Sequence, residues 1–181
     1  MQSNPHSPEH GFASVSKSSA RILILGSMPG RKSLDEQQYY AHPRNAFWAI
    51  MGELFGFYAT MPYAQRLEQL ADQHVALWDV TQHCIRPGSL DAAIRDATAN
   101  DFRAFLTAHP QIHAIFFNGR KAEELFRRLV LPGLADKHRS IERHTLPSTS
   151  PAHAAYTFEK KLEAWGIIRT CLEPLTLPSS T

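Results

Sequence analysis

Small and polar residues follow four apolar runs of the sequence, where they could bind a ligand. Glycine lets backbone approach a ligand closely, while amide, hydroxyl and carboxylate side chains can form hydrogen bonds or transfer a proton. Because the same residues mark ordinary turns, each segment taken alone favours a turn. Together they predict a site built from distant parts of the chain. The four segments are 26–30 (Gly-Ser-Met-Pro-Gly), Asp79, 118–121 (Asn-Gly-Arg-Lys) and 147–151 (Pro-Ser-Thr-Ser-Pro).

The first of these segments opens a long loop, 26–48, that has features of a nucleotide-binding surface. Tyr39 and Tyr40 offer flat rings on which a base could stack, and Arg31, Lys32 and Arg44 could contact phosphates. The loop lacks the Gly-Lys-Ser/Thr ending of a P-loop. The alternative is that the tyrosines pack in the core and the charges are solvated.

The apolar patterns predict the elements that must position these residues. Buried strands are expected at 21–25, 75–80, 112–117 and 141–146, the last being polar enough for a sheet edge. The order of strands and helices predicts a three-layer α/β/α fold around a mostly parallel four-stranded sheet. The carboxyl ends of parallel strands share one edge, where ligands bind. Helices are expected at 45–55, after Pro62, after the caps Ser89 and Asn100, at 120–131 and at 158–172.

The composition of the 181-residue chain, with 43% apolar residues, predicts one folded domain over 21–172. Residues 1–20 are expected to form a flexible arm and 173–181 a tail. The sequence shows neither a membrane span nor a signal peptide, so we expect a cytoplasmic protein with its two cysteines reduced. A net charge of +2 permits nucleic-acid binding through a local basic patch, which should weaken with salt.

Several segments together resemble the uracil-DNA glycosylase superfamily, and most of all its hypoxanthine-DNA (deoxyinosine) glycosylase branch. Residues 26–30 with 39–48 resemble the first motif, 117–122 the strand end that recognises the base, and 146–151 the loop that enters the minor groove. Residues 78–80 and 86–91 also fit this branch. The resemblance spans residues 21–169. It implies an enzyme that flips a deaminated base, hypoxanthine or uracil, out of DNA and hydrolyses its N-glycosidic bond.

The resemblance also implies the partners of the protein. DNA with a damaged base is the expected partner, with no cofactor, metal, membrane or obligate protein partner. Two cysteines exclude the iron–sulfur branches, which need four. Met28 stands where uracil-specific members carry Asp and mismatch-specific members carry Asn, and Leu146 replaces a motif His. A thioether accepts hydrogen bonds only weakly, and a leucine side chain cannot donate one to the departing base. These two residues therefore argue against the mechanism of the uracil enzymes.

The resemblance implies a role for residues of each motif. Asn45 is the expected catalytic residue, compensating for Met28, although its place also suits a helix N-cap. Asn118 would read the edge of the base or, alternatively, serve as a turn residue before Gly119. Tyr40 and Phe47 are candidates to stack on the base, and Phe47 could equally be a core residue.

The remaining candidates line the pocket or contact the DNA backbone. Gly26, Ser27 and Met28 would border the base. The expected DNA contacts are Ser148, Thr149, Ser150, Arg120 and Lys121, with His42, His153 and Asp79 as candidate acid or base groups.

Three other functions stay open on the sequence alone. They are a G/U mismatch-specific uracil-DNA glycosylase, a nucleic-acid-binding α/β module without catalysis, and a Ser-His-Asp hydrolase. Met28 favours the binding module, whereas the lack of a Gly-x-Ser-x-Gly motif argues against the hydrolase. The glycosylase hypothesis requires that the loops carrying Ser27, Asn45, Asn118 and Ser148 surround one slot for a single base.

Overall fold

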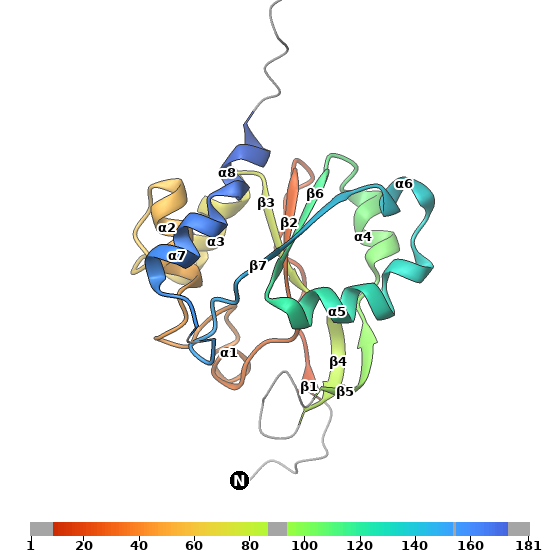
Figure 1. Cartoon of the computed structure of the whole chain (residues 1–181), viewed down its shortest axis with the longest axis horizontal. Coiled ribbons are helices and arrows are strands. Elements are labelled where there is room, and N and C mark those ends of the chain that lie inside the picture. Colours follow the sequence, from red (N-terminus) through yellow and green to blue (C-terminus); the bar gives the residue numbers. More distant parts are fainter. Residues whose placement is uncertain (1–8, 87–93, 154, 174–181) are drawn as a thin grey trace, which may run out of the picture.

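A parallel four-stranded sheet lies at the centre of the computed structural model, which describes residues 9–86, 94–153 and 155–173 (Figure 1). Its strand order is β3-β2-β6-β7, and each neighbouring pair is parallel. The central strands β2 and β6 are almost wholly buried because helices cover both faces, whereas the edge strand β7 is polar. The strands are β2 (Ile22–Gly26), β3 (Val75–Asp79), β6 (Ala114–Asn118) and β7 (Glu142–Leu146).

Helices pack on both faces of this sheet. Alternate residues of β2 enter different cores, with Ile22 and Ile24 on one face and Leu23 and Leu25 on the other. One face carries α2 (Phe47–Phe55), α3 (Tyr63–Asp72), α7 (Phe158–Trp165) and α8 (Ile167–Leu172). The other carries α4 (Phe102–Ala108), α5 (Arg120–Leu129), the 3-10 turn η3 (Leu131–Gly133) and α6 (Asp136–Arg139). The prediction of a three-layer α/β/α fold is confirmed.

Two helix predictions need correction. The single helix expected at 158–172 is divided into α7 and α8 at Gly166. The cap of α4 is Asp101, whose side chain accepts a hydrogen bond from the Ala104 amide, whereas Asn100 donates to the Asp79 carbonyl. The helix expected after Ser89 lies outside the described residues.

A second, antiparallel sheet was not predicted. It has the order β1-β4-β5, with β1 at Glu9–His10, β4 at Thr81–Ile85 and β5 at Arg95–Ala99. Only Val80 separates β3 from β4, so the sequence pattern indicated only one strand there. The second sheet contributes Cys84 to the core that β2 and α5 share.

The flexible arm predicted for 1–20 is wrong for residues 9–20. The Phe12 carbonyl accepts a hydrogen bond from the Trp78 indole, and Val15 pairs with Leu77 through two backbone hydrogen bonds. This mostly polar segment docks through these backbone hydrogen bonds and through the side chains of Phe12 and Val15, which pack against the core. Among the described residues, no helix is long and apolar enough to cross a bilayer.

Tyr39 links this N-terminal segment to the domain and should make stability decrease at alkaline pH. Its hydroxyl donates to the Ala13 carbonyl, and burial, with the charge of Asp79, raises its pKa far above the ordinary value of 10.0. Below pH 10 the neutral Tyr39 side chain contributes fully to the free energy of unfolding. Above pH 10 this residue ionises only in the unfolded chain, so the free energy of unfolding falls by up to about 1.4 kcal/mol per pH unit.

Tyr39→Phe should therefore flatten the fall in stability above pH 10 and cost about 1 kcal/mol at neutral pH through the lost hydrogen bond. Urea unfolding between pH 7 and pH 11 measures both effects. Tyr58→Phe is the control, because this side chain is 80% exposed. Equal slopes in the wild type and in Tyr39→Phe would contradict the prediction.

Candidate active site

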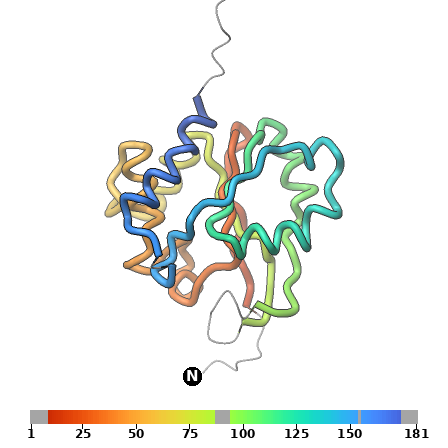
Figure 2. Tube along the Cα trace, in the orientation of Figure 1, coloured from red at the N-terminus to blue at the C-terminus, as the bar shows by residue number. Residues whose placement is uncertain are grey.

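A cavity of about 500 Å³ opens at the carboxyl ends of the parallel strands. Its volume lies within the roughly 300–1,000 Å³ range of small-ligand pockets. Two segments that line it are the loop after β2 and the loop after β7, and Figure 2 shows their backbones, orange and blue, side by side at the lower end of the sheet. The structure thus brings the four predicted segments together. They contribute residues 26–33 and 39–45 with gaps, Asp79, 118–121 and 148–153.

All but one of the predicted site residues border this cavity. They are Gly26, Ser27, Met28, Tyr40, His42, Asn45, Asp79, Asn118, Arg120, Lys121, Ser148, Thr149, Ser150 and His153. The exception is Phe47, which is fully buried in the core and stacks on Tyr40 with ring centroids 3.9 Å apart. Phe47 begins α2 and faces the sheet, so the prediction that it contacts a base directly is wrong. Phe47 instead supports the Tyr40 ring, and Tyr40 borders the cavity.

The loop after β2 holds Tyr40 in place through several local contacts. This loop contains an unpredicted short helix, α1 (Arg31–Glu36), and the buried hydroxyl of Ser33 accepts a hydrogen bond from the Ala41 amide. The Trp48 indole donates to the Tyr39 carbonyl. Tyr40 itself has a positive φ of 56°, which turns its ring toward Phe47. The result is a fixed aromatic surface on one wall.

Asp79 lies directly against Gly26 in the cavity. A Cβ atom on Gly26 would come within 2.3 Å of the Asp79 carboxylate and 3.4 Å of the Tyr40 hydroxyl oxygen. The Asp79 residue is only 3% exposed, although it borders the cavity. Glycine at position 26 therefore leaves the space that this buried carboxylate occupies.

Met28 faces the core as much as the cavity. It is 5% exposed, belongs to the core between β2 and α5, and its sulfur lies 3.2 Å from the Thr81 hydroxyl. The thioether therefore has a protein partner and offers no strong acceptor for water. Any water at this wall needs another residue to orient it.

Asn45 lies two residues before α2 and combines two features. Its Oδ1 accepts a hydrogen bond from the Phe47 amide at 3.0 Å, and its own amide donates to the His42 carbonyl at 2.8 Å. The N-cap position of α2 is Ala46, one residue later than the sequence indicated, and Asn45 instead bonds the first amide of the helix. Within the described part of the chain the Nδ2 group makes no hydrogen bond to protein, so it can donate to a ligand. The contact with the Phe47 amide fixes the side chain that carries this donor.

His42 is held in the same turn. Its Nδ1 accepts a hydrogen bond from the Arg44 amide at 3.1 Å. In the neutral ring the proton therefore resides on Nε2, which can donate. Because Nδ1 is occupied by the Arg44 amide and Nε2 carries the proton, this geometry favours a hydrogen-bond donor over a general base.

Asn118 and Thr149 form a reciprocal pair between β6 and the loop after β7. The Asn118 Nδ2 donates to the Thr149 hydroxyl and its Oδ1 accepts from the Thr149 amide, both at 2.8 Å. The Thr149 carbonyl in turn accepts from the Ala46 amide at 3.0 Å. One threonine therefore connects Asn118 to the residue beside Asn45.

Thr149 is 1% exposed, so the prediction that its side chain contacts a DNA phosphate is wrong. The hydroxyl is instead used to hold Asn118. Ser148 and Ser150, on either side of it, are half-buried and border the cavity. Alternating exposure along the loop explains why the three neighbours have different roles.

The loop after β7 is supported from beneath by α7 and by Gly119. The Trp165 indole donates to the Pro147 carbonyl at 3.0 Å, and the Lys161 ammonium lies 3.5 Å from the Ser150 carbonyl. Burial lowers the pKa of Lys161. Gly119 has a φ of 95°, and a Cβ there would meet Ser148 at 3.0 Å. A larger residue would push this loop away from β6.

Sequence reasoning assigned no role to Arg86, which also borders the cavity. Its side chain is 1% exposed, pairs with Glu9 at 2.6 Å and donates to the Pro29 carbonyl at 2.5 Å. Arg86 thereby ties the first loop to strand β1. No local signal could have found this, because Glu9 lay in the segment expected to be a loose arm.

The α/β/α fold and a cavity walled by amides, backbone and aromatic rings define the class of protein. A family model described as the uracil DNA glycosylase superfamily matches residues 12–169, so the chain belongs to this superfamily.

Two relatives are named hypoxanthine DNA glycosylase. One, from Methanosarcina acetivorans, is 35% identical over 162 residues, which cover 89% of this chain and 98% of the relative. The other, from Methanosarcina barkeri, is 38% identical over 117 residues, or 64% of this chain and 74% of the relative. The solution NMR structure of a candidate uracil DNA glycosylase from Methanosarcina acetivorans has a TM-score of 0.76 and 33% identity, covering 92% of this chain and all of that one.

Proposed function

We propose that this protein is a DNA glycosylase that removes hypoxanthine from DNA by hydrolysing the N-glycosidic bond. The observation that carries the proposal is that Asn45 and Asn118 border one cavity and are connected through Thr149. The two relatives named hypoxanthine DNA glycosylase support the choice of base. The superfamily match argues against the serine hydrolase that the sequence left open.

The base must leave the duplex to reach this cavity. Flipping costs a few kcal/mol, and least for a weakly paired base such as hypoxanthine. Tyr40 would stack on the flipped base. Asn118 would then bind the hypoxanthine lactam, because an amide can donate to O6 and accept from N1–H. Each polar atom of Asn118 has a second hydrogen-bonding position besides the one that Thr149 uses.

Hydrolysis joins a water oxygen to C1′ while the base departs with the electrons of the glycosidic bond. The sugar carries positive charge in the transition state and the base negative charge. The Nδ2 group of Asn45 would donate to the leaving base or to the water, a role that Met28 cannot take. The buried Asp79 carboxylate would stabilise the sugar cation or accept the proton of the water.

Contacts with the DNA backbone would come from the rim. Arg120 is exposed at the start of α5, and Ser148 and Ser150 lie on the loop opposite it. Lys121 is half-buried and contacts Glu124 at 3.2 Å, a contact that a phosphate would replace. Since these contacts are electrostatic, DNA binding should weaken as salt increases.

A fluorescent duplex with a single deoxyinosine tests the proposal. After incubation with the protein and treatment with alkali, strand cleavage at the inosine is expected, and none at an undamaged adenine. Parallel duplexes with G·U and G·T pairs test the mismatch-specific alternative, which predicts cleavage there and not at inosine. Binding without cleavage of any duplex would favour the module without catalysis.

Gly26→Ala should reduce the rate of base release about a hundredfold, because the added methyl group must displace the Asp79 carboxylate, which it would otherwise meet at 2.3 Å. A loss of stability of about 1–3 kcal/mol is expected from overpacking. Single-turnover cleavage of the inosine duplex measures the rate. Gly30→Ala is the matched control, since a Cβ at Gly30 meets nothing within 4 Å. Equal rates for both variants would show that the Asp79 position is unimportant.

A further inference from the structure

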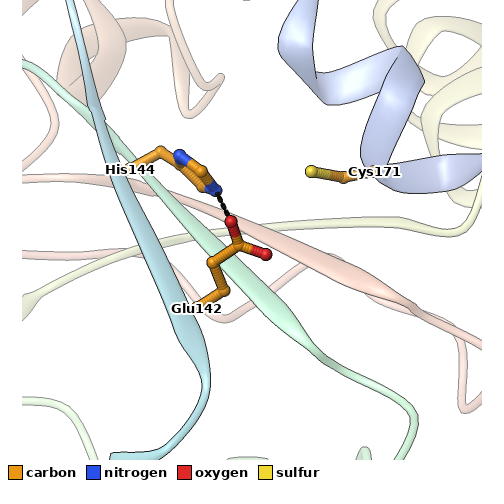
Figure 3. Close-up of side chains that lie close together, drawn as sticks. All are labelled: Glu142, His144 and Cys171. Atoms are coloured by element: carbon orange, nitrogen blue, oxygen red, sulfur yellow. Dashed lines mark ion pairs between the residues drawn. The ribbon is translucent and has the colours of Figure 1, made fainter.

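Glu142, His144 and Cys171 gather at a place that the glycosylase reaction does not use (Figure 3). Glu142 and His144 are two residues apart on β7 and project from the same face of the strand, toward α8, which carries Cys171. Their ligand atoms all lie within 4.8 Å of one another. Glu142 is the first residue of β7, whereas the cavity lies beyond its carboxyl end.

The His144 ring is already held in an orientation suited to ligation. It stacks on Phe116 with centroids 5.0 Å apart and an angle of 14° between the rings. Its Nε2 lies 2.8 Å from the Glu142 carboxylate. This nitrogen is nevertheless buried and, among the described residues, makes no hydrogen bond of acceptable geometry. A metal ion would satisfy both the nitrogen and the neighbouring carboxylate.

Cys171 is also positioned by contacts outside the cluster. Its carbonyl lies 2.9 Å from the His113 ring, and the next carbonyl, of Leu172, accepts a hydrogen bond from Arg21 at 2.6 Å. These contacts fix the end of α8 against the sheet. The thiol in Figure 3 extends toward His144.

We propose that Glu142, His144 and Cys171 bind one divalent ion of the zinc class, with water as the fourth ligand. Thiolate, imidazole and carboxylate are the usual ligands of Zn²⁺, at distances of roughly 2.0–2.3 Å, so the side chains need to close by about 1 Å. Mg²⁺ and Ca²⁺ prefer oxygen ligands and fit this set poorly. The bound ion would fasten the edge strand β7 to α8 and thereby stabilise the fold.

Burial and the charge of Glu142 raise the pKa of the Cys171 thiol, so the thiol keeps its proton in the metal-free protein. Zn²⁺ binding must displace this proton and release it to the solvent. No sequence pattern indicated such a site, because Cys171 lies 27 residues beyond His144 and on a different element.

The test uses the full-length, untagged protein, stripped of metal with a chelator that is then removed. Titration calorimetry with Zn²⁺ should give one ion per chain, and Zn²⁺ should raise the unfolding temperature. Glu142→Gln and Cys171→Ser should each weaken binding by at least about tenfold, as ligand changes cost no less than changes in supporting residues. With Co²⁺ as the probe, a thiolate-to-metal absorption band should appear in the wild type and be absent from Cys171→Ser.

Glu163→Gln, an exposed change on α7, is the matched control and should bind Zn²⁺ like the wild type. The exposed position of Glu142 makes its variant safe for folding, and circular dichroism checks the Cys171 variant. Absence of saturable Zn²⁺ binding, or unchanged affinity in both ligand variants, would overturn the proposal. Because the readouts are affinity and absorbance, failure of the glycosylase assay would leave this test valid.

Discussion

Asn45→Ala is expected to reduce the single-turnover rate of hypoxanthine release by about a hundredfold to a thousandfold, the usual loss for one fixed donor in a transition state. The reason is that the variant lacks the Nδ2 group, which the contact with the Phe47 amide holds at the cavity wall. Binding to the inosine duplex should change little. Loss of this one hydrogen bond should cost about 0.5–1.5 kcal/mol of stability, so the protein should remain folded.

Asn45→Ser separates the contact of this residue with the Phe47 amide from its Nδ2 donor. A serine hydroxyl can also accept from a backbone amide two residues on and should restore the stability that alanine loses, but it cannot place an amide donor at the same point. We therefore expect stable protein with a low rate of base release. If Asn45→Ser were as active as the wild type, the residue would serve only to hold the start of α2. Retained turnover in Asn45→Ala would refute the catalytic assignment.

Asn118→Ala is expected to reduce base release by at least about a hundredfold and to weaken discrimination between hypoxanthine and adenine. A site built to bind a polar edge loses most when its partner is left unpaired, and here the alanine removes both the donor and the acceptor. The loop after β7 also loses both of its hydrogen bonds with Asn118, one accepted by the Thr149 hydroxyl and one donated by the Thr149 amide. Single-turnover rates on inosine and adenine duplexes measure both effects.

Thr149→Val separates base recognition from support of the loop. Valine keeps the backbone amide that donates to the Asn118 Oδ1 and removes only the hydroxyl that accepts from Nδ2. We expect a fall of less than about tenfold in the rate, in line with the roughly 1 kcal/mol of one hydrogen bond. If Thr149→Val lost as much activity as Asn118→Ala, the role of Asn118 would be to hold the loop rather than to read the base.

Much of the central sheet was predictable because its strands are buried on both faces. A strand covered by helices on each side is a continuous apolar run, as in β2 and β6, and such runs differ clearly from amphipathic helices. The second sheet lacked this signal. Strand β5 reads Arg-Asp-Ala-Thr-Ala and is largely exposed, and β1 has only two residues. Short, polar strands leave no apolar pattern to detect.

The sequence by itself determined which segments meet at the cavity. Parallel strands bring their carboxyl ends to one edge, so Gly26, Asp79 and Asn118 had to converge once the strands were identified. The motifs in the connecting loops also identified the superfamily that the family model matches.

Only the tertiary structure decided what each side chain touches. Phe47 lies in the core, where it stacks on Tyr40, and Thr149 is buried between Asn118 and Ala46. Glu9 pairs with Arg86. The physical reason is distance along the chain. Strand and helix patterns arise from neighbours within a few positions, whereas the partners of these contacts are up to 103 residues apart and are chosen by packing.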